Sequence, residues 1–260
     1  MVKRKTPFKD ASVLIRDIET FLTKHSSLFR SQGSRISHFF EMSCYNYVVK
    51  FYENSGFTVL PKNLKQGVFR YKISAAGNPD NFSHFLVSKN VKSNNYEFEI
   101  HHNLSIECAH ERNIFYTADI SVIKKDSLER IDPPTYSVKR SCCKSINMET
   151  FFEVKHLSPF PELLFSFTGI PDSFLTRDLR NNIIQHLAPS LLLSGRANFH
   201  AEKIKKYLEN RYGINIILNL FGTPSAVYSK KYPKKKIGTL LYKGSAVCTR
   251  MGGWVKCICI

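Results

Sequence analysis

The chain lacks acidic residues at its C-terminal end: none follows Glu209, although nine basic side chains do. It also lacks long apolar runs, since the longest, at 187–193 and 214–221, are far shorter than the roughly 18 residues that span a bilayer. Its N-terminal apolar stretch is interrupted by Arg16 and Asp17, which is not typical of a secretion signal. We therefore expect no membrane span and a cytoplasmic protein.

Paired metal-binding or disulfide spacings are missing as well. The seven cysteines are an odd number, scattered without the Cys-x-x-Cys spacing of zinc loops, so reduced thiols are expected. The histidines show no spacing typical of a metal pair, and there is no glycine-rich phosphate loop. No Ser-His-Asp or Cys-His arrangement points to a hydrolase of the serine or cysteine type.

What the chain does have is positive charge, with a net value of +17 on an otherwise globular composition that is 43% hydrophobic. The excess lies at the two ends, chiefly at residues 229–236, where Lys230, Lys231, Lys234, Lys235 and Lys236 have no acid nearby in sequence. Such a cluster is typical of proteins that bind nucleic acid through counterion release. Charge alone leaves open a solvated loop that aids solubility.

The hydrophobic periodicity predicts an α/β fold. Helices are expected at 9–28, 35–54, 177–187 and 199–212, and strands at 57–60, 68–74, 82–87, 96–108, 115–123, 150–157, 188–194 and 214–221, with one or two more at 238–260. The apolar runs at 188–194 and 214–221 suit buried parallel strands. Together these elements predict a mixed sheet with helices on both faces.

The domain organisation follows from these elements and from the distribution of charge. We expect an N-terminal helical arm at 1–34 and one domain at 35–260. The domain contains a polar insertion or lid at 124–149 and a basic C-terminal extension from about residue 222.

Ionisable side chains occupy two of the apolar strands. Asp119 lies in the middle of one, while Glu153 and Lys155 are two residues apart on the other and so share a face. Charges on a hydrophobic strand are costly unless they are paired or bound to a metal. Two convergent carboxylates would suit Mg²⁺, and a lysine beside them would assist attack on a phosphodiester; a buried ion pair with Asp119 capping a turn is the alternative.

With these residues, the chain resembles the PD-(D/E)xK nuclease superfamily, the restriction-endonuclease-like fold. The resemblance covers about 35–221, with Glu41 on the leading helix, Asp119 on one strand, and Glu153 and Lys155 as the signature pair. It implies that fold, with extra strands and the N-terminal helix added. Glu97, Glu99 and Glu107 remain alternative sources of the strand carboxylate.

The resemblance also implies a Mg²⁺-dependent endonuclease, with Mn²⁺ able to substitute, that cuts DNA in restriction, defence or repair; RNA is the alternative substrate. Asp119, Glu153 and the Val154 carbonyl would bind one ion, Glu41 a second ion or the attacking water, and Lys155 would assist attack. Besides the lysines at 230–236, the expected phosphate contacts are Lys203, Lys205, Lys206, Arg140, Lys144 and Arg196. Double-strand cleavage would require a homodimer or larger oligomer. The alternative function is a non-catalytic nucleic-acid-binding or scaffolding protein that retains the fold.

Overall fold

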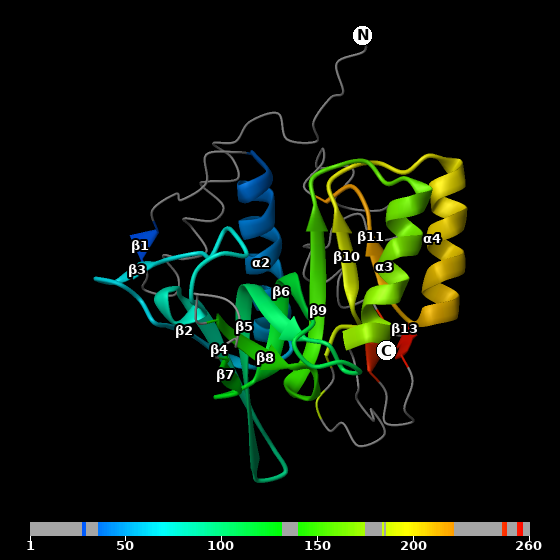
Figure 1. The fold of residues 1–260 in the computed structure, drawn as a ribbon. Coiled ribbons are helices and arrows are strands. Elements are labelled where there is room, and N and C mark those ends of the chain that lie inside the picture. The colour runs from blue at the N-terminus through cyan, green and yellow to red at the C-terminus, as the bar shows by residue number, and fades with distance from the viewer. Residues whose placement is uncertain are drawn as a thin grey trace.

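The centre of the molecule is a nine-stranded mixed sheet covered by helices on both faces (Figure 1). The computed structural model describes residues 28–29, 36–131, 140–174, 184, 186–220, 246–248 and 254–256. The helices are α2 (Ile36–Asn54), α3 (Pro161–Phe174) and α4 (Phe199–Tyr212). The strands of the sheet are β2 (Thr58–Lys62), β4 (His84–Val91), β5 (Asn94–Glu107), β6 (Phe115–Lys124), β7 (Leu128–Ile131), β8 (Arg140–Lys144), β9 (Met148–Lys155), β10 (Ser190–Leu193) and β11 (Asn215–Ile217).

The main path through the sheet runs β11-β10-β9-β6-β5-β4-β2. From β2 to β9 neighbouring strands are antiparallel, whereas β9, β10 and β11 are parallel. The β4–β5 hairpin turns through Lys92 and Ser93, whose positive φ angles of 49° and 68° suit a two-residue hairpin turn. Two separate pairs complete the structure, β1 (Leu28–Phe29) with β3 (Val68–Phe69), and β12 (Ala246–Cys248) with β13 (Trp254–Lys256).

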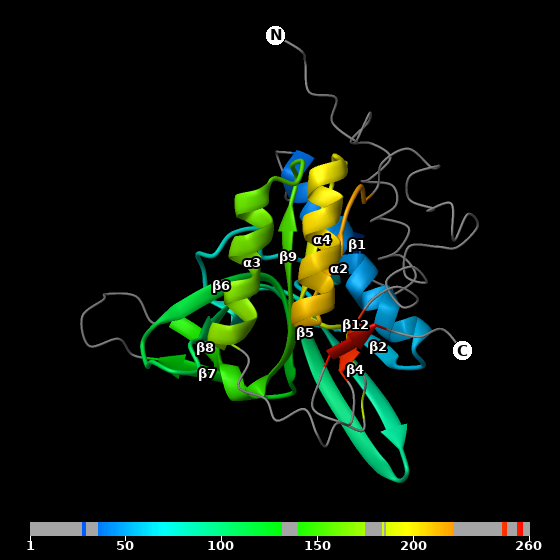
Figure 2. The ribbon, with the colours of Figure 1, turned by 90° about the vertical axis from the view of Figure 1, so that its right-hand side faces the viewer.

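Each face of the sheet has its own hydrophobic core. On one face α2 buries large aromatic side chains, including Tyr45 and Tyr52, against residues of the antiparallel strands. On the other face α3 and α4 pack side by side, and Phe167 and Leu208 contribute to a second cluster with Phe151 of β9 (Figure 2). This arrangement confirms the expected α/β class with a mixed sheet between helices.

The boundaries of α4 follow from local capping. The Asn198 side chain accepts a hydrogen bond from the Ala201 amide, and Gly213 takes the left-handed conformation (φ 60°) that ends the helix. Near its end, buried Glu209 accepts from the Ile216 amide at 3.0 Å and pairs with Lys205 at 2.9 Å. These contacts fix α4 against β11.

The register of the sheet is disturbed in β5 and β6. Asn103 in β5 has φ 52°, and the regular pairing skips from His102↔Ile120 to Leu104↔Ala118. Asp119 therefore lies opposite a distortion of the sheet. The pairing of β6 with β9 also ends here, since Ile120↔Phe152 is its last pair on this side.

Several expectations differ from the structure or fall outside it. The helix before β10 lies at Pro161–Phe174, although a helix was expected at 177–187, of which most residues lie outside the described ranges. The expected N-terminal helix at 9–28 lies outside them except for Leu28, which belongs to strand β1, and the lysines at 230–236 lie outside them entirely. The predicted insertion at 124–149 carries β7 and β8, and β8 joins β5 as a parallel strand. Within the described residues, no helix is long and apolar enough to cross a membrane.

Candidate active site

Asp119 lies where β6 and β9 separate. Its Oδ2 accepts a hydrogen bond from the Val154 backbone amide at 2.7 Å, two residues beyond Phe152, the last residue of β9 that pairs with β6. The side chain thus satisfies an amide that the strand pairing leaves open. This contact holds the Asp119 carboxylate against β9, where Glu153 and Lys155 are found.

Lys155 joins the two strand carboxylates. Its Nζ lies 2.9 Å from Asp119 Oδ2 and 2.9 Å from Glu153 Oε2, so those oxygens are at most twice this distance apart. Burial alone would lower the pKa of Lys155, but the two carboxylates raise it above its ordinary value. The ammonium therefore stays protonated at neutral pH and acts as a fixed positive charge.

Glu153 is the most deeply buried of the site carboxylates, with 7% of its side chain exposed. Burial raises its pKa, the neighbouring Asp119 raises it further, and Lys155 opposes both effects. Its Oε1 is buried and accepts no hydrogen bond of standard geometry from the described residues, although Tyr116 lies close enough to the carboxyl to lower its pKa. A buried carboxylate oxygen without a partner is costly unless a cation or an ordered water satisfies it.

Glu41 faces the same group from α2, across the edge of the sheet. Burial raises its pKa to about 7, and the charges of Asp119 and Glu153 add to this effect while Lys155 opposes it. The structure thus places Glu41, Asp119, Glu153 and Lys155 together. Three carboxylates and one ammonium leave a net negative charge, which is the electrostatic setting in which a divalent cation binds.

Two further residues of this region were missed by the sequence analysis. His102 is buried, and its Nε2 lies 3.8 Å from Glu41 Oε2. Burial lowers the pKa of His102 to about 3, so the ring stays neutral and supplies no compensating positive charge. Tyr116, at the start of β6, is close enough to Glu153 for each group to shift the pKa of the other. His102 is distant in sequence from the signature residues, whereas Tyr116 lies only three residues before Asp119 on β6.

The alternative strand acids lie elsewhere. Glu97 pairs with Lys125 at 3.0 Å, and Glu107 accepts from the Asn113 amide at 3.1 Å. Glu99 pairs with His101 at 2.9 Å. Among the candidates for the strand carboxylate, Asp119 therefore accepts a hydrogen bond from Lys155, and the three glutamates have the other partners named above.

The predicted phosphate contacts differ in whether their side chains are paired with an acid in the structure. Lys205 is paired with Glu209, and Lys144 lies 2.8 Å from Glu129. Lys203 and Lys206 are exposed on α4, and Arg196 is exposed in the loop before it. The side chain of Arg140 and the lysines at 230–236 lie outside the described part of the structure. Lys203 and Lys206 are therefore the stronger candidates on α4, and Arg196 stays a candidate because its side chain is exposed.

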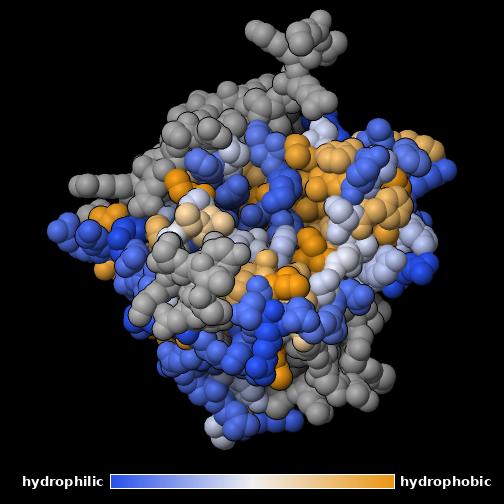
Figure 3. All heavy atoms as spheres, in the orientation of Figure 1, coloured by the Kyte–Doolittle hydropathy of each residue, from blue (hydrophilic) through white to orange (hydrophobic). Residues whose placement is uncertain are grey.

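Exposed aromatic rings accompany these cations. Figure 3 shows hydrophobic residues gathering on the side of the molecule that carries α3 and α4. Phe165 of α3 and Phe199 of α4 are 48% and 76% exposed, and Lys203 Nζ lies 4.4 Å from the centre of the Phe199 ring. Strands β9 and β10 are parallel, and Leu193, the last residue of β10, pairs with Lys155, the last residue of β9. Since α4 begins six residues after Leu193, its first turn follows the same ends of the strands that carry Glu153 and Lys155.

No family model, curated protein or solved structure matches this chain. The interpretation of the site therefore depends on the side chains that it brings together and on their electrostatics.

The raised pKa of Glu41 predicts a pH-dependent stability. Since the folded protein holds this carboxyl neutral up to about pH 7, its contribution to the free energy of unfolding is complete below pH 4.5 and is lost as the pH rises through 7. The wild type should therefore lose stability as the pH rises from 5 to 8, whereas Glu41→Gln has no carboxyl to ionise at this position. In EDTA, the free energy of unfolding of Glu41→Gln relative to the wild type should rise by on the order of 2 kcal/mol over this range. Urea denaturation at both pH values measures the gain.

The matched control for this prediction is Glu53→Gln, three turns further along α2. The change in relative stability from pH 5 to pH 8 should be larger for Glu41→Gln than for Glu53→Gln. If the stability of Glu41→Gln relative to the wild type is the same at pH 5 and pH 8, burial does not hold the Glu41 carboxyl neutral.

Proposed function

We propose that this protein is a metal-dependent nuclease of the restriction-endonuclease-like fold that hydrolyses phosphodiester bonds, with DNA as the substrate. The observation that carries the proposal is the position of Lys155, whose ammonium contacts both Asp119 and Glu153 beside the carboxyl of Glu41. An acid-rich, partly buried group with one fixed cation is typical of sites that bind a divalent ion and a phosphate together.

The residues present suit Mg²⁺. Asp119, Glu153 and Glu41 offer hard carboxylate oxygens, and the buried Glu153 Oε1 is available for a cation. The role expected for the Val154 carbonyl stays a prediction, because the contact that the structure shows is made by its amide. Bound Mg²⁺ would polarise the phosphate and lower the pKa of a water molecule.

The protein side chains would perform the remaining steps. Lys155, held protonated by its two partners, would orient the attacking water and offset the charge that develops on the phosphate oxygens. Glu41, with a pKa of about 7, is suited to accept the proton from that water. Asp119 and Glu153 fix the ammonium and exclude alternative positions for it.

Contacts to the nucleic acid are proposed along α4 and the loop before it. Lys203, Lys206 and Arg196 would bind backbone phosphates, and the exposed ring of Phe199 offers a face for a base. These residues position the strand without reading its sequence. Cleavage of both strands would require two copies of the chain, so a homo-oligomer forms part of the proposal.

The direct test is cleavage of plasmid and single-stranded DNA in Mg²⁺ or Mn²⁺. We expect the wild type to cut and Lys155→Ala to lose on the order of 100-fold in rate, because one cation that stabilises the transition state is removed. DNA binding, measured by fluorescence anisotropy in Ca²⁺, should persist in the variant.

The matched control is Lys125→Ala, which removes an exposed lysine that is also paired with a glutamate. It should cut at the wild-type rate. If the wild type cleaves neither DNA nor RNA of several structures, the alternative of a non-catalytic nucleic-acid-binding protein is favoured. In that case Lys155 and its partners form a structural ion pair, consistent with the short contact of Asp119 to the Val154 amide.

A further inference from the structure

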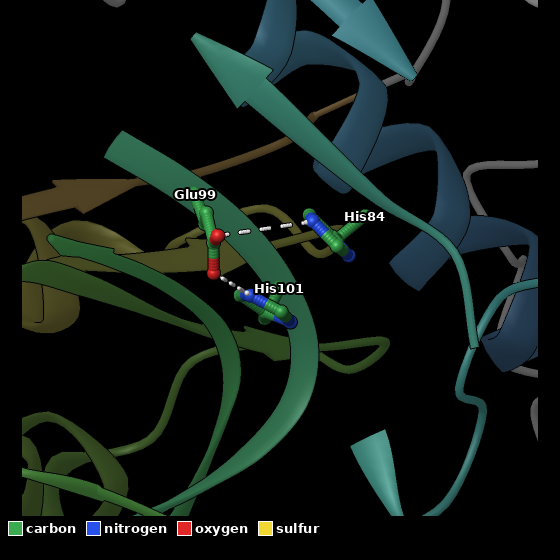
Figure 4. Close-up of side chains that lie close together, drawn as sticks. All are labelled: His84, Glu99 and His101. Atoms are coloured by element: carbon green, nitrogen blue, oxygen red, sulfur yellow. Dashed lines mark hydrogen bonds and ion pairs between the residues drawn. The ribbon is translucent and has the colours of Figure 1, made fainter. Parts of the chain in front are cut away.

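A second group of metal-ligating side chains lies on the hairpin formed by β4 and β5, apart from the carboxylates beside Lys155. Within the described ranges, three ligand atoms from His84, Glu99 and His101 lie within 4.8 Å of one another. Figure 4 shows the two imidazole rings one above the other, each with a nitrogen toward the Glu99 carboxylate. The sequence analysis missed this group because His84 is distant in sequence from the other two residues.

Sheet geometry explains why the three side chains meet. Glu99 and His101 are two residues apart on β5 and share a face. The pairing of Phe85 with Ile100 sets His84 across from His101, one position beyond the last pair. Side chains directly opposite each other in antiparallel strands lie on the same face, so the third side chain joins the first two.

The contacts place two imidazole nitrogens around one carboxylate. His101 Nε2 lies 2.9 Å from Glu99 Oε2, and His84 Nε2 lies 4.0 Å from Glu99 Oε1. The two rings are stacked, with centroids 4.6 Å apart and an angle of 20° between their planes. The three ligand atoms thus lie within 4.8 Å of one another on one face of the hairpin, close enough for small side-chain rotations to bring them to a shared ion.

The surroundings support a bound ion. Glu99 Oε1 accepts from the Asp126 amide at 3.3 Å, an outer contact of the kind that orients metal-binding carboxylates. Ser121 pairs with His101 across β5 and β6, and its buried hydroxyl has no hydrogen-bond partner among the described residues. A buried hydroxyl beside the group suits a water molecule or other ligand at an open coordination position.

We propose that His84, Glu99 and His101 bind one Zn²⁺ ion. The two imidazole nitrogens are borderline ligands that favour Zn²⁺ over Mg²⁺, zinc also accepts a carboxylate oxygen as the third ligand, and a fourth position is left open. Glu99 and His101 are 7% and 4% exposed, so an ion bound by them would be largely shielded from solvent. It ties β4 to β5, and the site does not depend on the proposed nuclease activity.

The test measures zinc bound to the full chain after it is stripped with EDTA and dialysed against Zn²⁺. We expect the wild type to hold one equivalent more than His84→Asn and Glu99→Gln, whose affinity should fall on the order of 100-fold. Added Zn²⁺ should raise the melting temperature of the wild type and not that of these variants. His200→Asn, which changes an exposed histidine of α4, should behave like the wild type.

Two outcomes would overturn the proposal. One is equal zinc content in the wild type and His84→Asn. The other concerns the absorption spectrum of the protein loaded with Co²⁺ in place of Zn²⁺. If the wild type shows thiolate charge-transfer bands and His84→Asn keeps them, the ion is bound by cysteines. The Co²⁺ spectrum decides the question even if Glu99→Gln fails to fold. Asp119→Asn, at the separate carboxylate group, should retain the zinc.

Discussion

Asp119→Asn is expected to lower the rate of DNA cleavage at least about 1000-fold while leaving the fold intact, because a loss of several kcal/mol of transition-state stabilisation corresponds to such a factor. The amide oxygen of asparagine can still accept from the Val154 amide, so the contact that holds β6 to β9 is kept. The negative charge that fixes Lys155 and would bind a cation is lost. Cleavage rates under saturating Mg²⁺ measure the effect.

Stability distinguishes a catalytic from a structural role for Asp119. In the variant Lys155 retains Glu153 as its partner, and the repulsion between Asp119 and the other acids disappears. We therefore expect the free energy of unfolding to change by less than about 1 kcal/mol. If Asp119→Asn instead loses both its activity and most of its free energy of unfolding, Asp119 has a structural role and satisfies the open amide of β9.

Gly195→Ala is expected to destabilise the protein by about 3 kcal/mol or more, the largest stability effect of a single methyl group that the structure suggests. A Cβ at this position would lie 2.3 Å from Ser158 Cα and 2.6 Å from the Leu157 carbonyl oxygen. Both contacts are with backbone, which cannot move aside as a side chain does. The Gly195 amide also donates to that carbonyl at 3.0 Å, so the close approach is part of the fold.

Gly169→Ala is the matched control for this substitution. It lies inside α3, where an added Cβ meets nothing within 4 Å. Alanine favours the helix, so a gain of about 0.5–1 kcal/mol is expected. Chemical denaturation of both variants measures the difference, and similar stabilities would show that the loop at Gly195 can move away from Leu157.

Loss of the loop position should also affect the site. Gly195 follows β10, whose Leu193 pairs with Lys155, and its amide holds the segment just beyond β9. A displaced loop would move Arg196 and the start of α4, which carry proposed phosphate contacts. Gly195→Ala is therefore expected to weaken DNA binding as well as stability, whereas Lys155→Ala should lower the cleavage rate and leave DNA binding unchanged.

Local patterns in the sequence were sufficient for most of the secondary structure. The boundaries of α4 were predicted because Gly213 and the helical spacing before it act within a few residues. The buried parallel strands β10 and β11 were predicted from short apolar runs. Helix α3 was not predicted because its two prolines, Pro161 at the start and Pro171 inside, weaken the local helical pattern, whereas tertiary packing supports the helix.

The sequence by itself determined that Glu153 and Lys155 share a face, because side chains two residues apart on a strand always do. Only the tertiary structure decided that Asp119 reaches the Val154 amide, and that Glu41 faces the same group. It likewise brought His84 to Glu99 and His101. These contacts join distant segments, and they depend on strand register and on where β6 and β9 separate, which no local pattern specifies.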